Sequence, residues 1–191
     1  MAPVLRDPAV WAIAVIGLLM VPFDEPLLGF TIALLERHRG LSPAGATLVA
    51  LVGLTGGIVS YTVLARRWAG VGYRTLLTGA FVAMTAGALV VAFVPLVPVV
   101  ALAGFVVSAG LNLSWLGVQH RSLTLWPGRA GATRAVVGTL EVAGLAVPAA
   151  IGAVADRAGL VAAVASYAFL GLVLVALARS TGGSGLPDIA G

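Results

Sequence analysis

The sequence has no cysteine, no lysine and few charged residues of any kind. Without cysteine the chain has no disulfide framework, thiol nucleophile or thiolate metal site. Its two histidines, His38 and His120, are far apart in the sequence and do not form an H-E-x-x-H motif. We therefore expect neither a metal centre nor a bound cofactor.

Charged residues make up only 9% of the 191 residues, whereas 60% are hydrophobic and the mean hydropathy is +1.09. This composition lies far outside that of a soluble domain. A helix needs about 20 residues to cross a hydrocarbon core of about 30 Å, and it satisfies its own backbone there. The sequence predicts an all-α protein of the lipid bilayer with six spans, at roughly 9–35, 44–65, 75–94, 98–119, 134–155 and 159–178.

The net charge of +4 comes from 11 arginines, which are scattered over the breaks between apolar runs. They form no basic stripe, so we expect no nucleic-acid partner. A cytoplasmic N terminus places eight arginines inside and leaves only Arg37, Arg39 and Arg157 outside. The excess predicts a multi-pass protein of the cell (inner) membrane with both termini in the cytoplasm. Residues 1–179 form one expected transmembrane domain, and the Gly/Ser-rich stretch 180–191 an expected disordered cytoplasmic tail.

Two breaks in the sequence are similar. Ala65-Arg66-Arg67 aligns with Ala155-Asp156-Arg157 at a separation of 90 residues, which indicates two three-helix repeats. Because three is odd, the second repeat enters the membrane from the opposite side, so the repeats are inverted. Inverted repeats are typical of secondary transporters, in which two arrangements open one site alternately to each side.

Two further patterns concern the second run alone. Ser42-Pro43 is typical of a helix N-cap followed by proline at the first helical position. Gly53 and Gly57 lie four residues apart and hence on one helix face, where small residues let two helices approach closely. We interpret this glycine pair as a helix-packing surface.

An acidic pair interrupts the first run, in V-P-F-D-E-P-L at 21–27. Ionisable groups at membrane depth cost about 2.5–3.5 kcal/mol each on insertion scales, so they seldom persist without use. Adjacent helical residues point about 100° apart, so Asp24 and Glu25 face one point only if the helix is irregular. Pro22 and Pro26 favour such irregularity, and we predict a break in this span.

Three stretches resemble a known family: L-L-G-F-T-I-A-L-L-E-R-H-R-G-L-S-P, L-W-P-G-R-A-G-A-T-R-A-V-V-G-T-L-E and G-A-V-A-D-R-A-G. Together they resemble the C-terminal six-helix half of a major facilitator superfamily transporter, and the likeness covers about residues 5 to 179. The third stretch is similar to the superfamily's loop signature, which implies a gating role for Gly152, Asp156, Arg157 and Gly159. The corresponding first-repeat loop departs from it at Thr62 and Arg66.

The resemblance implies twelve helices in two halves with a solute site between them, and this chain supplies six. We expect a second six-helix chain or a homodimer as partner; a truncated reading frame is the other interpretation. In the superfamily the first, second, fourth and fifth helices of each half line the cavity. The polar residues Asp24, Glu25, Asn112 and Glu141 all fall on spans of that set.

A buried carboxylate has its charged form disfavoured, which suits it to exchanging protons. We therefore expect Glu25 or Glu141, with Asp24 as coupled partner, to carry the proton of a small-solute transporter that works by alternating access. The solute-binding candidates are Asn112, Trp115 and Gln119.

Other interpretations stay open. In one, Asp24 and Glu25 have a structural role: they pair with Arg37 or Arg39, or they accept hydrogen bonds from the free backbone N–H groups beside the prolines. Asn112 would likewise bond only to a neighbouring helix. For the chain as a whole, the alternative to a transporter is a non-transporting scaffold or an inactive remnant. We expect no enzyme, because Ser108 lacks the G-x-S context of an intramembrane serine protease.

Overall fold

The computed structural model describes residues 2–67 and 70–181, and the regular secondary structure in this part of the chain is entirely helical. Six of its helical stretches are long and apolar enough to cross a membrane: Pro8–Arg39, Pro43–Leu64, Tyr73–Phe93, Val97–Thr124, Ala130–Ala158 and Leu160–Ser180. We number them spans one to six. The predicted all-α fold is confirmed for the described residues, and so are six helices capable of spanning a membrane, as expected of a multi-pass membrane protein. Most of the tail predicted at 180–191 lies outside the described residues.

Three of the six spans are interrupted helices. After the short α1 (Ala2–Leu5), span one consists of α2 (Pro8–Met20), the 3-10 turn η1 (Val21–Phe23) and α3 (Glu25–Arg39). Span two consists of α4 (Pro43–Val59) and the π-helical turn η2 (Ser60–Leu64), and α5 (Ala65–Arg67) follows it. Span five consists of α8 (Ala130–Ala143), the 3-10 turn η3 (Gly144–Ala146) and α9 (Val147–Ala158). Spans three, four and six are the continuous helices α6 (Tyr73–Phe93), α7 (Val97–Thr124) and α10 (Leu160–Ser180).

Several helices extend beyond the apolar runs that predict them. α3 continues through the charged residues to Arg39, and α7 continues to Thr124. Charged and polar side chains do not stop a helix; residues with special backbone geometry do. α3 ends at Gly40, whose φ of +66° lies in the left-handed region. Ser42 then caps α4 by accepting a hydrogen bond from the Gly45 N–H at 3.2 Å, as predicted.

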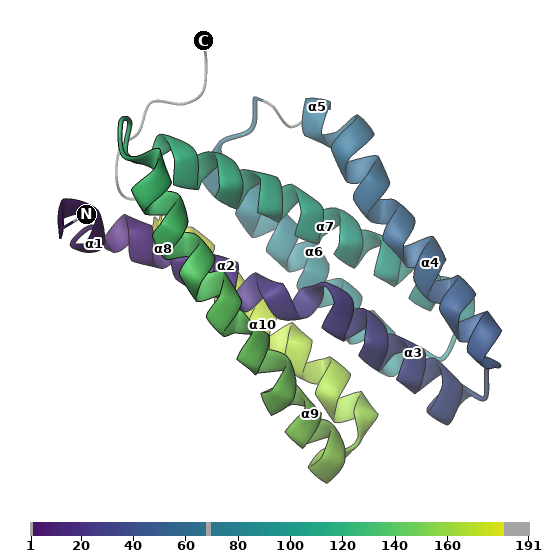
Figure 1. The fold of residues 1–191 in the computed structure, drawn as a ribbon. Coiled ribbons are helices and arrows are strands. Elements are labelled where there is room, and N and C mark those ends of the chain that lie inside the picture. Colours follow the sequence, from purple (N-terminus) through teal and green to yellow (C-terminus); the bar gives the residue numbers. More distant parts are fainter. Residues whose placement is uncertain (1, 68–69, 182–191) are drawn as a thin grey trace.

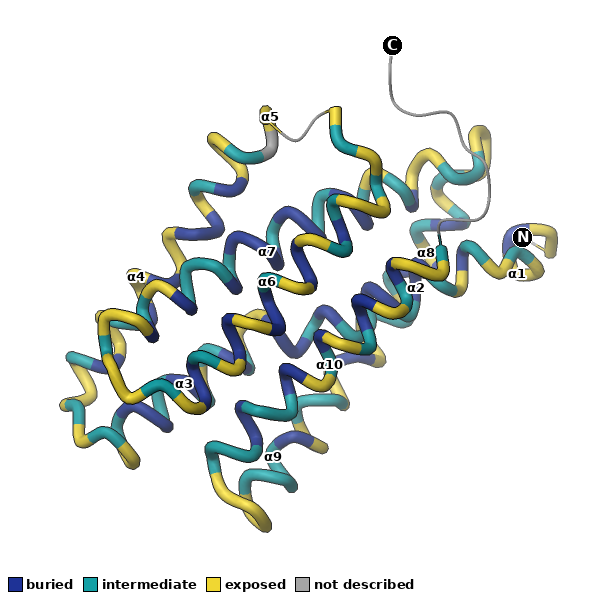
Figure 2. The backbone as a smooth tube through the Cα atoms, turned by 180° about the vertical axis from the view of Figure 1, so that it is seen from behind, coloured by how far each residue is buried: buried dark blue, intermediate teal, exposed yellow. Residues whose placement is uncertain are grey.

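The spans form two layers (Figure 1). Spans one, two, four and five make the front layer, in the spatial order α4, α7, α2–α3, α8–α9, and α6 and α10 lie behind them. Figure 2 shows the back layer from its own side, where buried and exposed residues alternate along α6 and α10. α1 and α5 lie at one end of the bundle, and the ends of α3 and α9 lie at the other.

Glycines set the close contact of α4 with α7. A Cβ added to Gly53 would lie 3.2 Å from the Gly104 carbonyl carbon. A Cβ on Gly56 would overlap the carbonyl oxygen of Phe105. The side of α4 that carries Gly53 and Gly57 is therefore a helix-packing surface, as the spacing predicts.

We expect Gly56→Ala to lower the free energy of unfolding by about 1–3 kcal/mol, because the added methyl meets backbone atoms that cannot rotate away. The measurement is unfolding of the purified protein in mixed micelles. The matched control is Gly79→Ala on α6, where a Cβ meets nothing within 4 Å, and which should keep or raise stability by up to about 1 kcal/mol. Equal stability of the two variants would contradict close packing at Gly56.

Candidate functional site

Span one breaks at its middle, where the sequence predicts irregularity. η1 ends at Phe23, and Asp24 leaves the helical conformation with φ −82° and ψ −125° before α3 begins at Glu25. Pro22 lies within η1 and Pro26 in the first turn of α3, the two positions where proline interrupts the hydrogen bonding of a continuous helix. The break separates two neighbours: Phe23 is 97% buried, whereas Asp24 is exposed.

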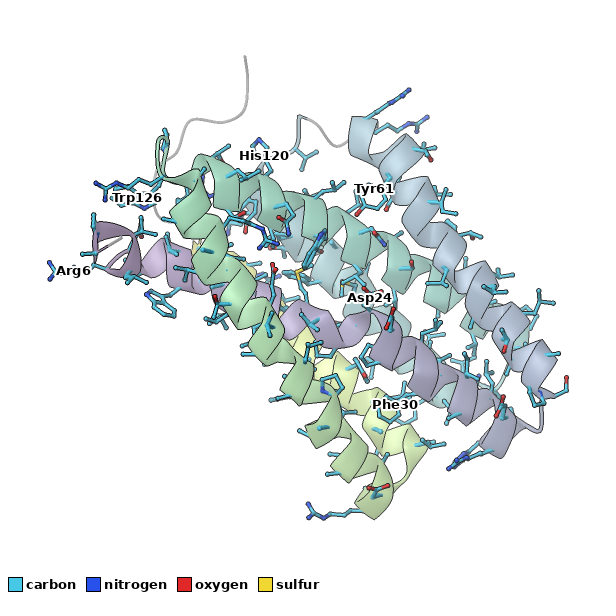
Figure 3. All side chains as sticks on the ribbon, in the orientation of Figure 1. Arg6, Asp24, Phe30, Tyr61, His120 and Trp126 are labelled. Carbon is cyan, nitrogen blue, oxygen red and sulfur yellow. The ribbon has the colours of Figure 1, made fainter. Side chains whose placement is uncertain are left out.

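The acidic pair opens into a cavity of about 480 Å³, which we call the polar cavity. All four spans of the front layer contribute to its lining, which consists of Met20, Val21, Asp24, Glu25, Pro26, Tyr61, Leu111, Asn112, Trp115 and Leu145. Asp24 and Tyr61 can be followed in Figure 3 on the front of the bundle. The structure therefore brings together four of the residues selected from the sequence: the two acids, Asn112 and Trp115.

A second, much narrower cavity of about 50 Å³ adjoins the first, between α3, α4 and α7. We call it the apolar slot, because its lining is mostly aliphatic and includes Leu27, Val49 and Val107. Asp24 and Leu111 line both cavities. These two residues therefore lie where the two cavities meet, and Glu25 lines only the larger one.

Neither acid of the polar cavity is neutralised by a basic group. Among the described residues, the one ion pair joins Arg134 to Glu141, so neither Arg37 nor Arg39 pairs with Asp24 or Glu25. Arg39 instead donates from Nη2 to the Val91 carbonyl at 2.7 Å. The start of α3 has no side-chain cap from Asp24 either. Both alternative uses of the acidic pair considered from the sequence are therefore absent from this arrangement.

Glu141 lies apart from the polar cavity, on the face of α8 that packs against α2. Arg134 Nη1 donates to Glu141 Oε2 at 2.9 Å. The other oxygen, Oε1, is buried without a hydrogen-bond partner, and a Cβ on Gly17 would lie 3.2 Å from it. Arg134, one of the eight arginines that the sequence places on the cytoplasmic side, reaches along its own helix to this carboxylate. Sequence reasoning missed this pair, although a spacing of seven residues places both side chains on one helix face.

The remaining solute-binding candidates differ in position. Asn112 donates from Nδ2 to the Ser108 carbonyl of its own helix at 2.9 Å, and it faces the polar cavity. Gln119 lies one turn beyond Trp115 on α7 and does not line the cavity. Tyr61 does line it, although it was not a sequence candidate. It lies in the π-helical turn of span two, whose effect on side-chain direction has no sequence signature.

The proposed gating residues form a helix end instead of an extended loop. α9 continues to Ala158, and Gly159 alone makes the turn into α10, with a φ of +87° that favours glycine. Asp156 and Arg157 are exposed on the last turn of α9. A Cβ on Gly152 would meet nothing within 4 Å. None of these residues lines the polar cavity or the apolar slot.

We expect Arg134→Met to destabilise the protein by about 2–3 kcal/mol, somewhat less than the loss of a fully buried pair because the Arg134 side chain is 32% exposed. Adding Glu141→Met removes the stranded charge and should recover most of the loss. Unfolding free energies of the single and double variants measure this coupling. Arg157→Met, at an exposed arginine, is the control and should change stability by less than about 0.5 kcal/mol. Additive effects of the two substitutions would contradict the pairing.

Comparison with known proteins adds no family to this geometry. No protein-family model matches the chain, and a search of curated proteins found no match. The features that bear on function are the polar cavity at the break of span one, the apolar slot beside it and the Arg134–Glu141 pair.

Proposed function

We propose that this protein is a secondary active transporter, or half of one, that moves a small solute across the cell membrane by alternating access. The observation that carries the proposal is the polar cavity. It lies where the middle of span one breaks, and it holds two carboxylates without a basic partner among the described residues. Intramembrane acids are expensive to keep, and broken helices at the bilayer midplane are where transporters bind their solutes.

The packing of the spans supports the inverted repeat. Exchanging spans one to three with spans four to six turns the contact of α2 with α8 into that of α7 with α4. The same exchange relates the contact of α3 with α4 to that of α7 with α8, and the contact of α10 with α3 to that of α6 with α7. Each of these contacts is present. The exception is α9 with α10, which has no comparable α4–α6 contact between described residues.

The front layer also supports a partner of the kind that a major facilitator superfamily half requires. Only 28% and 22% of the residues in the most apolar stretches of spans two and five are buried within the chain, against 50% for span three. These two spans flank the polar cavity, whose open side carries Leu145 with 64% of its surface exposed. A second copy of the chain, or another six-helix chain, would close the cavity and cover these surfaces.

Proton coupling follows from the two acidic sites. Glu25 and Asp24 line a cavity with no counter-cation among the described residues, so a bound proton or a cationic solute would neutralise them. Glu141 is paired with Arg134 and has one oxygen buried without a partner. Protonation of Glu141 would release Arg134 and weaken the link between the two ends of α8.

We also propose that both termini lie in the cytoplasm, because the distribution of arginine favours this orientation.

We expect Glu25→Gln and Glu141→Gln to reduce pH-gradient-driven uptake to background in proteoliposomes, because an amide cannot accept the coupled proton. The measurement uses a panel of radiolabelled cationic, neutral and anionic small solutes. Glu36→Gln is the matched control, since Glu36 lies on the same helix as Glu25 and lines neither cavity. Unchanged uptake by both the Glu25→Gln and the Glu141→Gln variants would overturn the carboxylate mechanism.

Absence of uptake for every solute, from stable and correctly inserted protein, would instead support the alternative of a non-transporting scaffold or an inactive remnant.

We expect single cysteines on the front layer, but not on the back layer, to cross-link two copies. The chain has no cysteine of its own, so each product is unambiguous. Leu145→Cys, at the open side of the cavity, should give a dimer band with a short bismaleimide in native membranes. Phe169→Cys on α10 is the control, because Phe169 is equally exposed, at 67%, on the back layer. A stronger dimer band at Phe169→Cys would exclude closure of the cavity by a second copy.

A further inference from the structure

The polar cavity and the apolar slot are neighbours that differ in size and in their charged groups. Their linings share Asp24 and Leu111, so a molecule bound at these residues contacts both cavities. Glu25 lines only the polar cavity, which is roughly ten times larger, at about 480 Å³ against about 50 Å³. A ligand that occupies both must therefore have a large group joined to a small one.

The charge of the polar cavity determines which group of the ligand it can hold. Two carboxylates line the polar cavity, and among the described residues no arginine or histidine lines either cavity. The arginines of α3, Arg37 and Arg39, lie in its last turn at the far end of the helix from Glu25, and Arg39 donates to the Val91 carbonyl there. Acids without a counter-charge in a cavity with apolar walls attract a cation and repel an anion. The aromatic rings of Tyr61 and Trp115 on the lining add surfaces on which an organic cation is stabilised.

The size and lining of the slot determine which group of the ligand it can hold. A cavity needs about 10–15 Å³ on this measure to hold one water, so about 50 Å³ corresponds to about four water-sized positions. Leu27, Leu28, Val49 and Val107 make the walls largely apolar. A short alkyl chain suits such a space, since each methylene transferred into it gains hydrophobic free energy without needing a polar partner.

We propose that this site binds an amphiphilic organic cation, with the cationic head between Asp24, Glu25 and the aromatic residues of the polar cavity and a short alkyl tail in the apolar slot. The inference deepens the proposed transport function and rests on it for its physiological meaning. Binding itself needs only the geometry of the two cavities.

Quaternary ammonium probes test both ends of the site. We expect hexyltrimethylammonium to bind the full-length protein in lipid nanodiscs more tightly than tetramethylammonium, by about threefold to fourfold per methylene until the slot is filled. Hexanesulfonate has the same tail with the opposite charge and should not bind. Calorimetric titration, with empty nanodiscs subtracted, measures each affinity. Equal affinity for the two cations, or binding of the sulfonate, would overturn the proposal.

Variants assign the two ends. Asp24→Asn combined with Glu25→Gln should weaken binding of both cations by about fivefold or more, whereas Glu36→Gln should leave it unchanged. Ala50→Leu places a larger side chain in the slot, and should remove the advantage of the hexyl tail while keeping tetramethylammonium binding. That internal comparison also shows that the variant is folded. If Glu36→Gln lost the tighter binding of hexyltrimethylammonium, or if Ala50→Leu kept it, the alkyl tail would lie outside the slot.

The outcomes separate this inference from the transport proposal. Selective binding of the amphiphilic cation without uptake of any solute would retain the site and overturn transport. Uptake of a neutral or anionic solute, without binding of either cation, would retain transport and overturn the cationic ligand.

Discussion

Hydrocarbon offers no hydrogen-bond partner to a broken backbone and no solvation to an unpaired carboxylate, and the architecture of this protein depends on how it meets that constraint at Asp24. The break occurs in span one, which packs against spans two, four, five and six, so protein surrounds its backbone on several sides. Phe23, buried just before the break, packs edge-on against Tyr167 of α10 with ring centroids 5.3 Å apart. The back layer therefore braces the break, and the acidic pair is left to the front.

Charge is handled in two different ways at membrane depth. Glu141 has an internal cation, Arg134, on its own helix and is pressed against α2 at Gly17. Asp24 and Glu25 have no such partner among the described residues and face an open cavity. A paired acid stabilises one arrangement of two helices, whereas unpaired acids need a ligand, a proton or water. The two acidic sites therefore differ in what they need from their surroundings.

The backbone irregularities coincide with the front layer. The turns η1, η2 and η3 belong to spans one, two and five, while the back-layer helices α6 and α10 are continuous. Small residues let neighbouring helices within each layer approach closely. A Cβ on Gly171 of α10 would overlap the Thr85 side chain of α6 in the back layer, as one on Gly56 of α4 would overlap α7 in the front layer. Continuous helices behind and interrupted helices in front fit the proposal that a partner contacts the front surface.

The sequence by itself determined the number of spans, their approximate ends and the break at Asp24, because hydropathy, glycine and proline act through local physics. It also selected Asn112 and Trp115, which the structure places with the acidic pair, as polar or aromatic residues within the fourth apolar run. Only the tertiary structure decided that Glu141 pairs with Arg134, that Gln119 lies off the cavity, and that Tyr61 and Leu145 complete it. These facts depend on which helix faces which. A few polar residues in a hydrophobic sequence do not specify how each helix is rotated about its axis.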